Sequence, residues 1–491
     1  MNGIFDVRDY GAKGDGACLD TAAVQAAVDA AAATGGRVAV PPGVYLCGTI
    51  VLKSRVTLDL LPGARILGSP RLEDYTPREW GHNKDITRWH LILAEGAEHV
   101  TITGEGEIDG NGPAFWQKDR PHEWHFWREN LRRVSPMIQF DDCRHVRIEN
   151  VTIRNTPGWT VHLRRCEHVA VCGVTMRNGL FGPNNDGLDI NGCRYVTVSD
   201  CDIETGDDAI VLKTTHDAGP TEYVTVTNCV LKTSCVAFKL GSESWHPFRH
   251  IVLSNCVVPS CSRAVTLLTY DGGDIEHVRV SGLTGTTNSG WPVNRPIEVY
   301  SECRENLATG HEETLRQPER PAVPGRIRDV TLRDVDLVTD GRVMLVARED
   351  RPIEDLTIEG LRLRYVLLED PSAVGAKGWV TSAHTEVGSV AAAIVAENVR
   401  GLRLADLRVR WPEYPVPQEW HVLRSPNRVY NRHFYEGREE AIRSGEYRVP
   451  FSVLWARGVQ GEILLGDLTG SEGGPACYAP MHENIGKSRT S

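Results

Sequence analysis

Three aspartates, Asp186, Asp207 and Asp208, lie in two short motifs of the chain. The motifs read Asn184-Asn185-Asp186-Gly187-Leu188-Asp189-Ile190 and Gly206-Asp207-Asp208-Ala209-Ile210. Carboxylates held close together repel one another, so one of them keeps its proton to a higher pH than usual while another stays ionised. Such a set suits acid/base chemistry, and the hydrolysis of a glycosidic bond is the reaction that we expect.

The two motifs belong to successive copies of a repeat that must bring the aspartates together. Each copy is a short alternating strand, a bend with Asn, Asp or Gly, and a second short strand. Copies begin at His168, Tyr195, Tyr223, His250 and His277, at spacings of 27, 28, 27 and 27 residues. A steady period of this size indicates stacked units, and the period-two alternation indicates strands. We therefore predict an all-β fold, a parallel β-helix. The histidines that recur at the repeat start are interpreted as structural turn residues.

The strand phase predicts which side chains face the groove. The apolar pairs of successive coils should point inward, and they are Leu188/Ile190, Ile210/Leu212, Phe238/Leu240 and Val265/Leu267. Asp189, Val211, Lys239 and Thr266 should then form one outward column. Asp186 and Asp208 are 22 residues apart, which is one coil, so their carboxylates are expected to face the same groove.

Both ends of the chain differ from the repeat, but we predict a single domain over residues 1–491. Residues 1–70 should hold an alanine-rich capping helix, from Asp20 to Ala33, and the first coils; residues 71–410 should hold the central coils and the groove. Residues 411–491 form an aromatic-rich extension that serves as a cap, as a wall over the groove, or as both. One more coil is expected near Val459–Leu468.

Composition excludes several classes of protein. A net charge of −11 and a pI near 5.9 argue against a nucleic-acid partner, and the absence of a long apolar run argues against a membrane span. No secretion signal is evident at the start of the chain. The thirteen cysteines form no Cys-x-x-Cys pair, and Cys201, Cys229 and Cys256 occupy matching repeat positions. We expect reduced structural thiols and a cytoplasmic location.

The chain resembles the polygalacturonase-type glycoside hydrolases of family 28 over roughly residues 5 to 300. Asn184-Asn185-Asp186 stands for the Asn-Thr-Asp of that family and Gly206-Asp207-Asp208 for its Gly-Asp-Asp. The resemblance implies a right-handed parallel β-helix and an inverting hydrolase that needs neither a metal nor a cofactor. It assigns Asp207 as the general acid, and Asp186 and Asp208 as the carboxylates that activate water.

Two departures from the family pattern bear on the substrate. The histidine of the family's Gly-His-Gly falls at Val236, and its Arg-Ile-Lys, which grips a uronate carboxylate, falls at Thr266-Leu267-Leu268. Lys239 could supply the lost positive charge, or it could pair with Asp189 or Glu243 instead. His216, or else His246, is the candidate replacement for the histidine.

Further residues are expected to contact the substrate, namely Asn184, Asp189, Lys213 and Tyr300. The substrate we expect is a pectin-derived oligosaccharide, a galacturonan or rhamnogalacturonan fragment, cleaved from one end. A polysaccharide lyase or uronate epimerase stays open, with Asp186, Asp189, Asp207 and Asp208 around calcium and Lys239 as base. A carbohydrate-binding β-helix without catalysis is the third reading. The sequence leaves the oligomeric state open.

Overall fold

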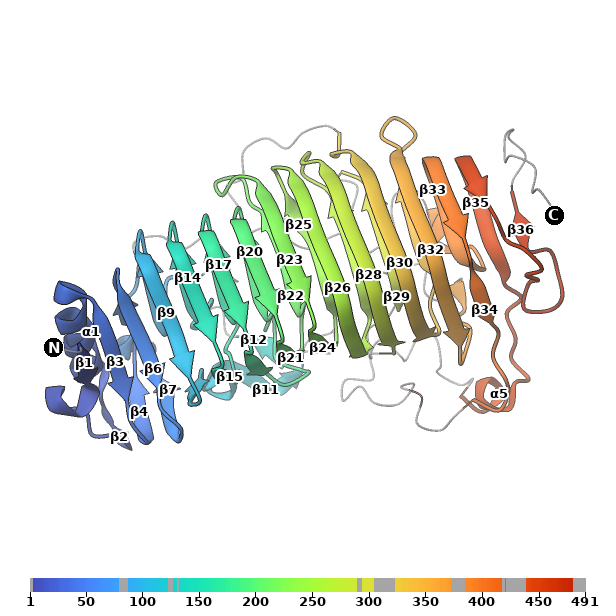
Figure 1. Ribbon diagram of the computed structural model, residues 1–491. Coiled ribbons are helices and arrows are strands. Elements are labelled where there is room, and N and C mark those ends of the chain that lie inside the picture. Colours follow the sequence, from blue (N-terminus) through green and yellow to red (C-terminus); the bar gives the residue numbers. More distant parts are fainter. Residues whose placement is uncertain are drawn as a thin grey trace.

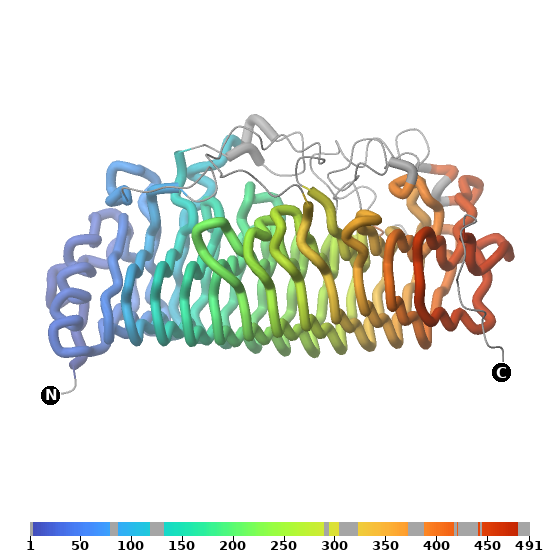
Figure 2. Tube along the Cα trace, turned by 90° about the horizontal axis from the view of Figure 1, so that it is seen from above, coloured from blue at the N-terminus to red at the C-terminus, as the bar shows by residue number. Residues whose placement is uncertain are grey.

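The computed structural model describes residues 3–78, 87–121, 127–129, 132–288, 294–303, 323–371, 385–416, 420 and 439–479. Within these ranges 34 strands pair in parallel into one continuous sheet. The sheet winds into an elongated solenoid whose coils follow one another from the N-terminus to the C-terminus (Figures 1 and 2). The predicted fold class, a right-handed parallel β-helix, is confirmed.

The N-terminal end is closed by a helix, as predicted. Helix α1 (Thr21–Thr34) follows Asp20, whose carboxylate accepts hydrogen bonds from the backbone of Lys13 and Gly14. The helix buries one face, made of Val24, Ala27, Val28 and Ala31, against the first strands. An apolar helix face in this position covers the open end of the first coil (Figure 1).

The first coils contain short strands. They are β1 (Ile4–Asp6), β2 (Asp15–Leu19), β3 (Gly36–Val40), β4 (Gly43–Cys47), β5 (Ile50–Leu52), β6 (Val56–Leu60), β7 (Ala64–Gly68), β8 (Ile92–Glu95), β9 (Glu98–Gly104) and β10 (Glu107–Asp109). Three 3-10 turns interrupt them, η1 (Val7–Tyr10), η2 (Leu72–Asp74) and η3 (Gly112–Phe115). The antiparallel pair β11 (Trp116–Pro121) and β12 (Trp127–Glu129) stands apart from the main sheet.

Each later coil has three sides. The first side, which carries the candidate site, contains β13 (Ile138–Asp141), β16 (Val161–Arg164), β19 (Leu188–Asn191), β22 (Ile210–Thr214), β25 (Val236–Ser244), β27 (Arg263–Thr269), β29 (Arg295–Ser301) and β31 (Val343–Ala347). The second side contains β14 (Arg144–Glu149), β17 (Glu167–Cys172), β20 (Arg194–Ser199) and β23 (Thr221–Thr227). The third contains β15 (Thr152–Arg154), β18 (Thr175–Arg177), β21 (Asp202–Thr205), β24 (Val230–Thr233) and β34 (Arg408–Arg410).

Longer strands run through a corner between two sides. They are β26 (Phe248–Cys261), β28 (Ile275–Thr287), β30 (Ile327–Thr339), β32 (Ile353–Tyr365), β33 (Ala392–Ala405) and β35 (Ser452–Ile463). Strand β35 contains the start of the extra coil predicted near Val459–Leu468. The remaining elements are α3 (Thr385–Gly388), α5 (Glu439–Ser444) and β36 (Cys477–Tyr478).

The strand register confirms the predicted inward and outward columns. Leu188, Ile210, Phe238 and Val265 lie opposite one another in successive coils and are fully buried in the central core. Side chains of this kind each stabilise the fold by about 1.5–3 kcal/mol when buried. The outward column runs in the order Asp189, Val211, Lys239, Thr266 and Glu298.

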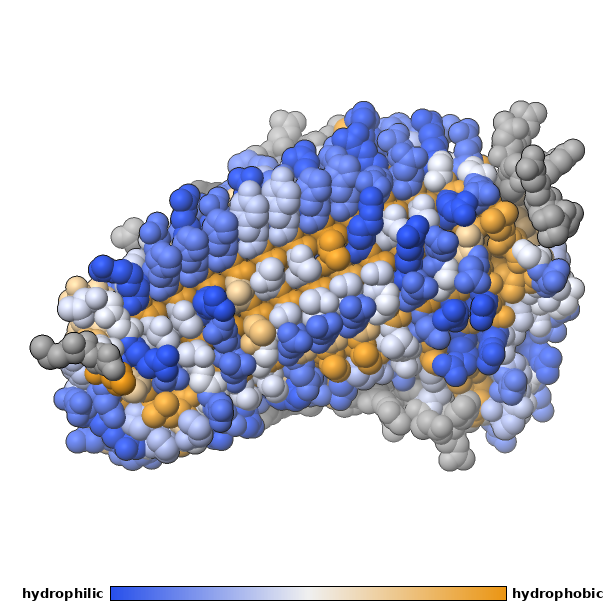
Figure 3. Space-filling model, viewed as in Figure 1, coloured by the Kyte–Doolittle hydropathy of each residue, from blue (hydrophilic) through white to orange (hydrophobic). Residues whose placement is uncertain are grey.

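The repeat starts form a ladder of stacked rings. The first residue of each repeat has φ between 56° and 58°, in the left-handed region. These residues are His168, Tyr195, Tyr223, His250 and His277. Their rings stack at centroid distances of 4.9 to 5.1 Å. This supports the interpretation of the repeated histidines as structural turn residues. Hydrophobic and hydrophilic residues form stripes on the surface. The stripes run along the molecule, in the direction in which the coils stack and across the strands (Figure 3).

All thirteen cysteines lie within the described ranges and are free thiols. Cys201, Cys229 and Cys256 are buried in the central core at matching positions, as the sequence predicts. No helix among the described residues is long and apolar enough to cross a membrane.

Part of the aromatic extension packs against the solenoid. Trp411 stacks on Tyr365 at 5.3 Å and packs edge-on against Phe451. Tyr430, His433, Phe434 and Tyr435 lie outside the described residues, so the predicted wall over the groove is untested. The predicted internal boundaries at residues 70 and 410 also stay predictions.

Candidate active site

Asp186 and Asp208 occupy equivalent places on adjacent coils, each two residues before the register pair formed by Leu188 and Ile210. The backbone N–H of Gly187 donates to the carbonyl of Asp208 at 2.8 Å, which continues the ladder into the turn. The register therefore puts Asp186 and Asp208 at the same position of adjacent coils, as the one-coil spacing in the sequence predicts.

Asn185 fixes the turn that carries Asp207. Its Nδ2 donates to the carbonyls of Asn178 and Gly179 at 2.8 and 2.9 Å. Its Oδ1 accepts from the backbone N–H groups of Gly206 and Asp207 at 2.7 and 3.0 Å. One fully buried amide thus uses both ends to hold two adjacent coils in register. The sequence reading chose the neighbouring Asn184, which is half-buried with φ of 46°.

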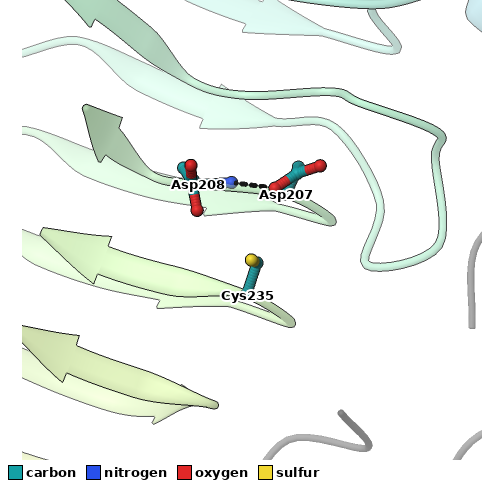
Figure 4. Close-up of side chains that lie close together, drawn as sticks. All are labelled: Asp207, Asp208 and Cys235. Atoms are coloured by element: carbon teal, nitrogen blue, oxygen red, sulfur yellow. Dashed lines mark hydrogen bonds between the residues drawn. The ribbon is translucent and has the colours of Figure 1, made fainter. Parts of the chain in front are cut away.

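Asp207 and Asp208 project from the same turn, beside Cys235 of the next coil (Figure 4). The backbone N–H of Asp208 donates to Oδ1 of Asp207 at 2.9 Å. The Cys235 sulfur and one carboxylate oxygen of each aspartate all lie within 4.8 Å of one another. The three groups therefore form one compact cluster at the turn.

Two lysines neutralise part of the negative charge. Lys239 Nζ lies 2.8 Å from Oδ2 of Asp208. The alternative that Lys239 pairs with Asp189 or Glu243 is therefore wrong, because Lys213 takes those partners, at 3.9 and 2.9 Å. Lys213 also lies over the ring of Trp159, at 4.7 Å.

The environment separates the protonation behaviour of Asp207 from that of Asp208. Burial, followed by repulsion from Asp208, raises the pKa of Asp207 to about 6. Burial also disfavours the Asp208 carboxylate, but Lys239 and Lys213 outweigh it and hold the pKa of Asp208 below its ordinary value. One carboxyl can thus keep a proton near neutral pH while its neighbour is ionised.

Asp186 and Asp189 are the most strongly perturbed carboxyls of the site. Burial raises the pKa of Asp186 well above its ordinary value, and the charge of Asp207 adds to the effect. Burial likewise raises the pKa of Asp189, against the attraction of Lys213. Oδ1 of Asp186 and both oxygens of Asp189 have no hydrogen-bond partner among the described residues.

Three other predicted residues make contacts of their own. His216 is exposed and packs edge-on against Trp245, and its carbonyl interacts with the ring of His246. The thiol of Cys235, rather than either histidine, stands beside the acid. Tyr300 lies two residues after Glu298 on the same face of β29 and is buried in a second apolar cluster with Leu268 and Tyr270.

The side chains of the site do not form the predicted calcium cage. Among the described residues, the acidic, thiol and imidazole groups that converge closely enough to hold an ion are Asp207, Asp208 and Cys235. Asp186 and Asp189 do not join them at that distance. Calcium prefers six to eight oxygen ligands, so a set of two carboxylates and a thiol does not fit it.

The sequence reading missed four residues that shape the site, namely Asn185, Cys235, Arg263 and Glu298. Arg263 Nε lies 3.2 Å from Oε2 of Glu298, and both side chains are buried. Glu298 continues the outward column beyond Thr266, so strand alternation in Ile297-Glu298-Val299 was the available signal. Cys235 stood directly before Val236, the position assigned to the missing histidine.

Comparison with known proteins agrees with this geometry. Residues 72–235 match glycosyl hydrolases family 28, and residues 4–59 match the rhamnogalacturonase A/epimerase, pectate lyase-like group. The resemblance to family 28 is confirmed. A probable polygalacturonase of Vitis vinifera is 28% identical over 57% of this chain and 60% of its own length. The chain therefore spans less than two thirds of that relative.

Solved structures extend the likeness beyond the matched region. The exopolygalacturonase of Thermotoga maritima is 25% identical, with a TM-score of 0.59 over 74% of this chain and 89% of its own. The family 28 exopolygalacturonase of Yersinia enterocolitica shares the fold, with a TM-score of 0.66 at 18% identity, over 94% of this chain and 80% of its own.

Proposed function

We propose that this protein is an inverting glycoside hydrolase that cleaves pectin-derived oligosaccharides. The observation that carries the proposal is the division of roles between adjacent carboxyls, with Asp207 protonated up to a pH of about 6 and Asp208 ionised beside Lys239. Names of similar proteins, which include polygalacturonases and exopolygalacturonases, support the substrate class.

In this mechanism a water molecule attacks the anomeric carbon while the bond to the leaving oxygen breaks. Asp207 gives its proton to the leaving oxygen, and Asp208 takes a proton from the attacking water. Asp186, whose pKa is raised by burial, holds the water through its carboxyl on the coil before. The sequence reading shared water activation equally between Asp186 and Asp208, whereas the lysine contact favours Asp208 as the base.

The sugar-binding part of the groove is expected to accept an oligosaccharide from one end. Asn184, Lys213 and Glu243 border the aspartates and are the candidate sugar contacts among the described residues. Exo-action rests on the names of similar enzymes and stays part of the proposal. The thirteen free thiols support a reducing, cytoplasmic location, which is likewise proposed.

Lyase or epimerase chemistry is not favoured by any contact of the site. Such a reaction would use Lys239 as a neutral base. Burial favours the neutral amine, but Asp208 outweighs it and raises the pKa of Lys239. The lysine therefore stays protonated and serves as a counter-ion.

The test is to incubate the protein with oligogalacturonides that are labelled at the reducing end, and with rhamnogalacturonan fragments. New reducing ends, an inverted anomer seen by proton NMR in the first minutes, and no ultraviolet absorbance from an unsaturated product are expected. An unsaturated product, or binding without any cleavage, would contradict the proposed function.

A further inference from the structure

Cys235 occupies a site position that neither the motifs nor the proposed reaction explains. It lies between β24 and β25, on the coil that follows Asp207 and Asp208. Its backbone is held on both sides, since its N–H donates to the Thr233 hydroxyl at 2.9 Å and its carbonyl accepts from Ser262 and Arg263 at 2.8 and 3.1 Å. The side chain therefore has a fixed direction.

That direction is toward the aspartates. The sulfur lies within 4.8 Å of a carboxylate oxygen of both Asp207 and Asp208 (Figure 4), and the residue is only 4% exposed. Other buried thiols, such as Cys201 and Cys193, point at backbone carbonyls inside the core. A thiol is a weak donor, but a hydrogen bond inside a protein is electrostatically stronger than one in water.

We propose that Cys235 is a positioning residue for the general acid, its thiol donating to the carboxyl group of Asp207 and fixing that carboxyl against the turn. The proposal rests on the proposed function, in which Asp207 protonates the leaving oxygen. It also explains why Val236 can stand where the resembling family has a histidine. The adjacent residue, rather than a distant loop histidine, supplies the donor.

The pKa of Asp207 depends on the charged groups that surround it. Those around it are Asp186 and Asp189 on the preceding coil, Asp208 and Lys213 on its own coil, Cys235 and Lys239 on the next coil, and Arg263 on the coil after that. Burial, followed by the charge of Asp208, raises the pKa of Asp207, whereas Lys239 and the Cys235 thiol lower it. Removing the thiol alone should therefore raise that pKa.

The experiment compares the pH dependence of kcat for Cys235→Ala, Cys235→Ser and the wild type. In Cys235→Ala the alkaline limb should move to higher pH by about 0.5–1 unit, because the ionised carboxylate loses a donor. In Cys235→Ser a hydroxyl donor is restored, so the limb should return toward the wild-type position. The control is Cys261→Ala, which removes a buried thiol of β26 that contacts the Thr286 carbonyl and should leave the limb unmoved.

A uniform loss of activity without movement of the limb would indicate a merely structural role and overturn the proposal. Titration of Asp207 itself, by NMR of carboxyl-labelled aspartate with Asp207→Asn for assignment, separates this proposal from the proposed function. If no oligosaccharide is cleaved, the function fails, but an upward shift of the Asp207 titration in Cys235→Ala still supports the contact. An unchanged titration in that variant refutes it.

Discussion

At the scale of single residues, the site contains two carboxyl groups of the same kind whose charged neighbours differ. Asp207 and Asp208 are consecutive and share one turn, but only Asp208 has a lysine at 2.8 Å. A charge contact of this kind favours the ionised carboxylate, whereas burial without one favours the protonated form. The difference between the two roles therefore comes from Lys239 on the next coil.

Activity should fall as pH rises above about 6. The general acid is active only when protonated, and its pKa lies at about 6. On the acid side the fall should come below the ordinary carboxyl range, because the pKa of Asp208 is lowered. The kcat measured on a saturating oligosaccharide from pH 3 to 9 checks both limbs, and a rate that rises from pH 6 to 8 would be incompatible with Asp207 as the acid.

Replacement of Lys239 should disable the base. The Lys239→Met substitution removes the charge that most lowers the pKa of Asp208. We therefore expect kcat to drop by about 10- to 100-fold and the acid limb of the pH profile to move to higher pH. The matched control is Lys232→Met, since Lys232 also lies 2.8 Å from a carboxylate, Glu204, but at a partly exposed position away from the site. Equal effects of the two substitutions on kcat would remove Lys239 from the mechanism.

At the scale of elements, the turns before β19 and β22 decide whether the aspartates meet. The period and alternation of the sequence predicted the outward column from Asp189 to Thr266 because a strand has only two faces. The same reasoning did not reach Asn185, Cys235 or the partner of Lys239. Those lie in turns or depend on side-chain reach between coils, where no periodicity applies.

Substitution of Asn185 tests whether the turns position the aspartates. In Asn185→Asp the two N–H donors to Asn178 and Gly179 are lost and a charge faces their carbonyls, so stability should fall by about 1–3 kcal/mol per group left unsatisfied. Turnover should fall with it, because the same side chain holds the backbone of Asp207. Thermal unfolding and kcat should both be measured, with Asn184→Asp as the control expected to unfold near the wild-type temperature.

At the scale of the whole molecule, one parallel sheet carries both the ring ladder and the candidate site. Repeat spacing predicted this architecture because each coil buries its apolar side only on its neighbours. The end of the chain was predicted less completely, since the aromatic extension from Trp411 has no period. Trp411 itself proves to pack on Tyr365 and Phe451.

The accessibility of the thiols tests whether the whole chain adopts this fold. Of the thirteen cysteines, Cys18 is exposed, Cys172 and Cys477 are partly exposed, and the others are buried. A thiol reagent should therefore label one site rapidly and two more slowly in the native protein, and all thirteen after unfolding without reductant. Labelling of Cys18 should keep accelerating to a higher pH than that of an ordinary thiol, because a hydrogen bond with Asp15 raises the pKa of Cys18. Fewer than thirteen thiols in the unfolded chain would reveal disulfides.

The central claim is that stacked coils assemble Asp186, Asp207 and Asp208 into one catalytic acidic cluster, and Asp207→Asn tests it most directly. The variant should lose turnover yet unfold at a higher temperature than the wild type at pH 7, where the ionised Asp207 destabilises the folded state. Its pKa of about 6 against an ordinary 3.8 corresponds to at most about 3 kcal/mol, and this difference should shrink as pH falls through 6 and vanish below 3.8, where the carboxyl is protonated in both the folded and the unfolded wild type. Turnover equal to that of the wild type, in a folded variant, would contradict the account.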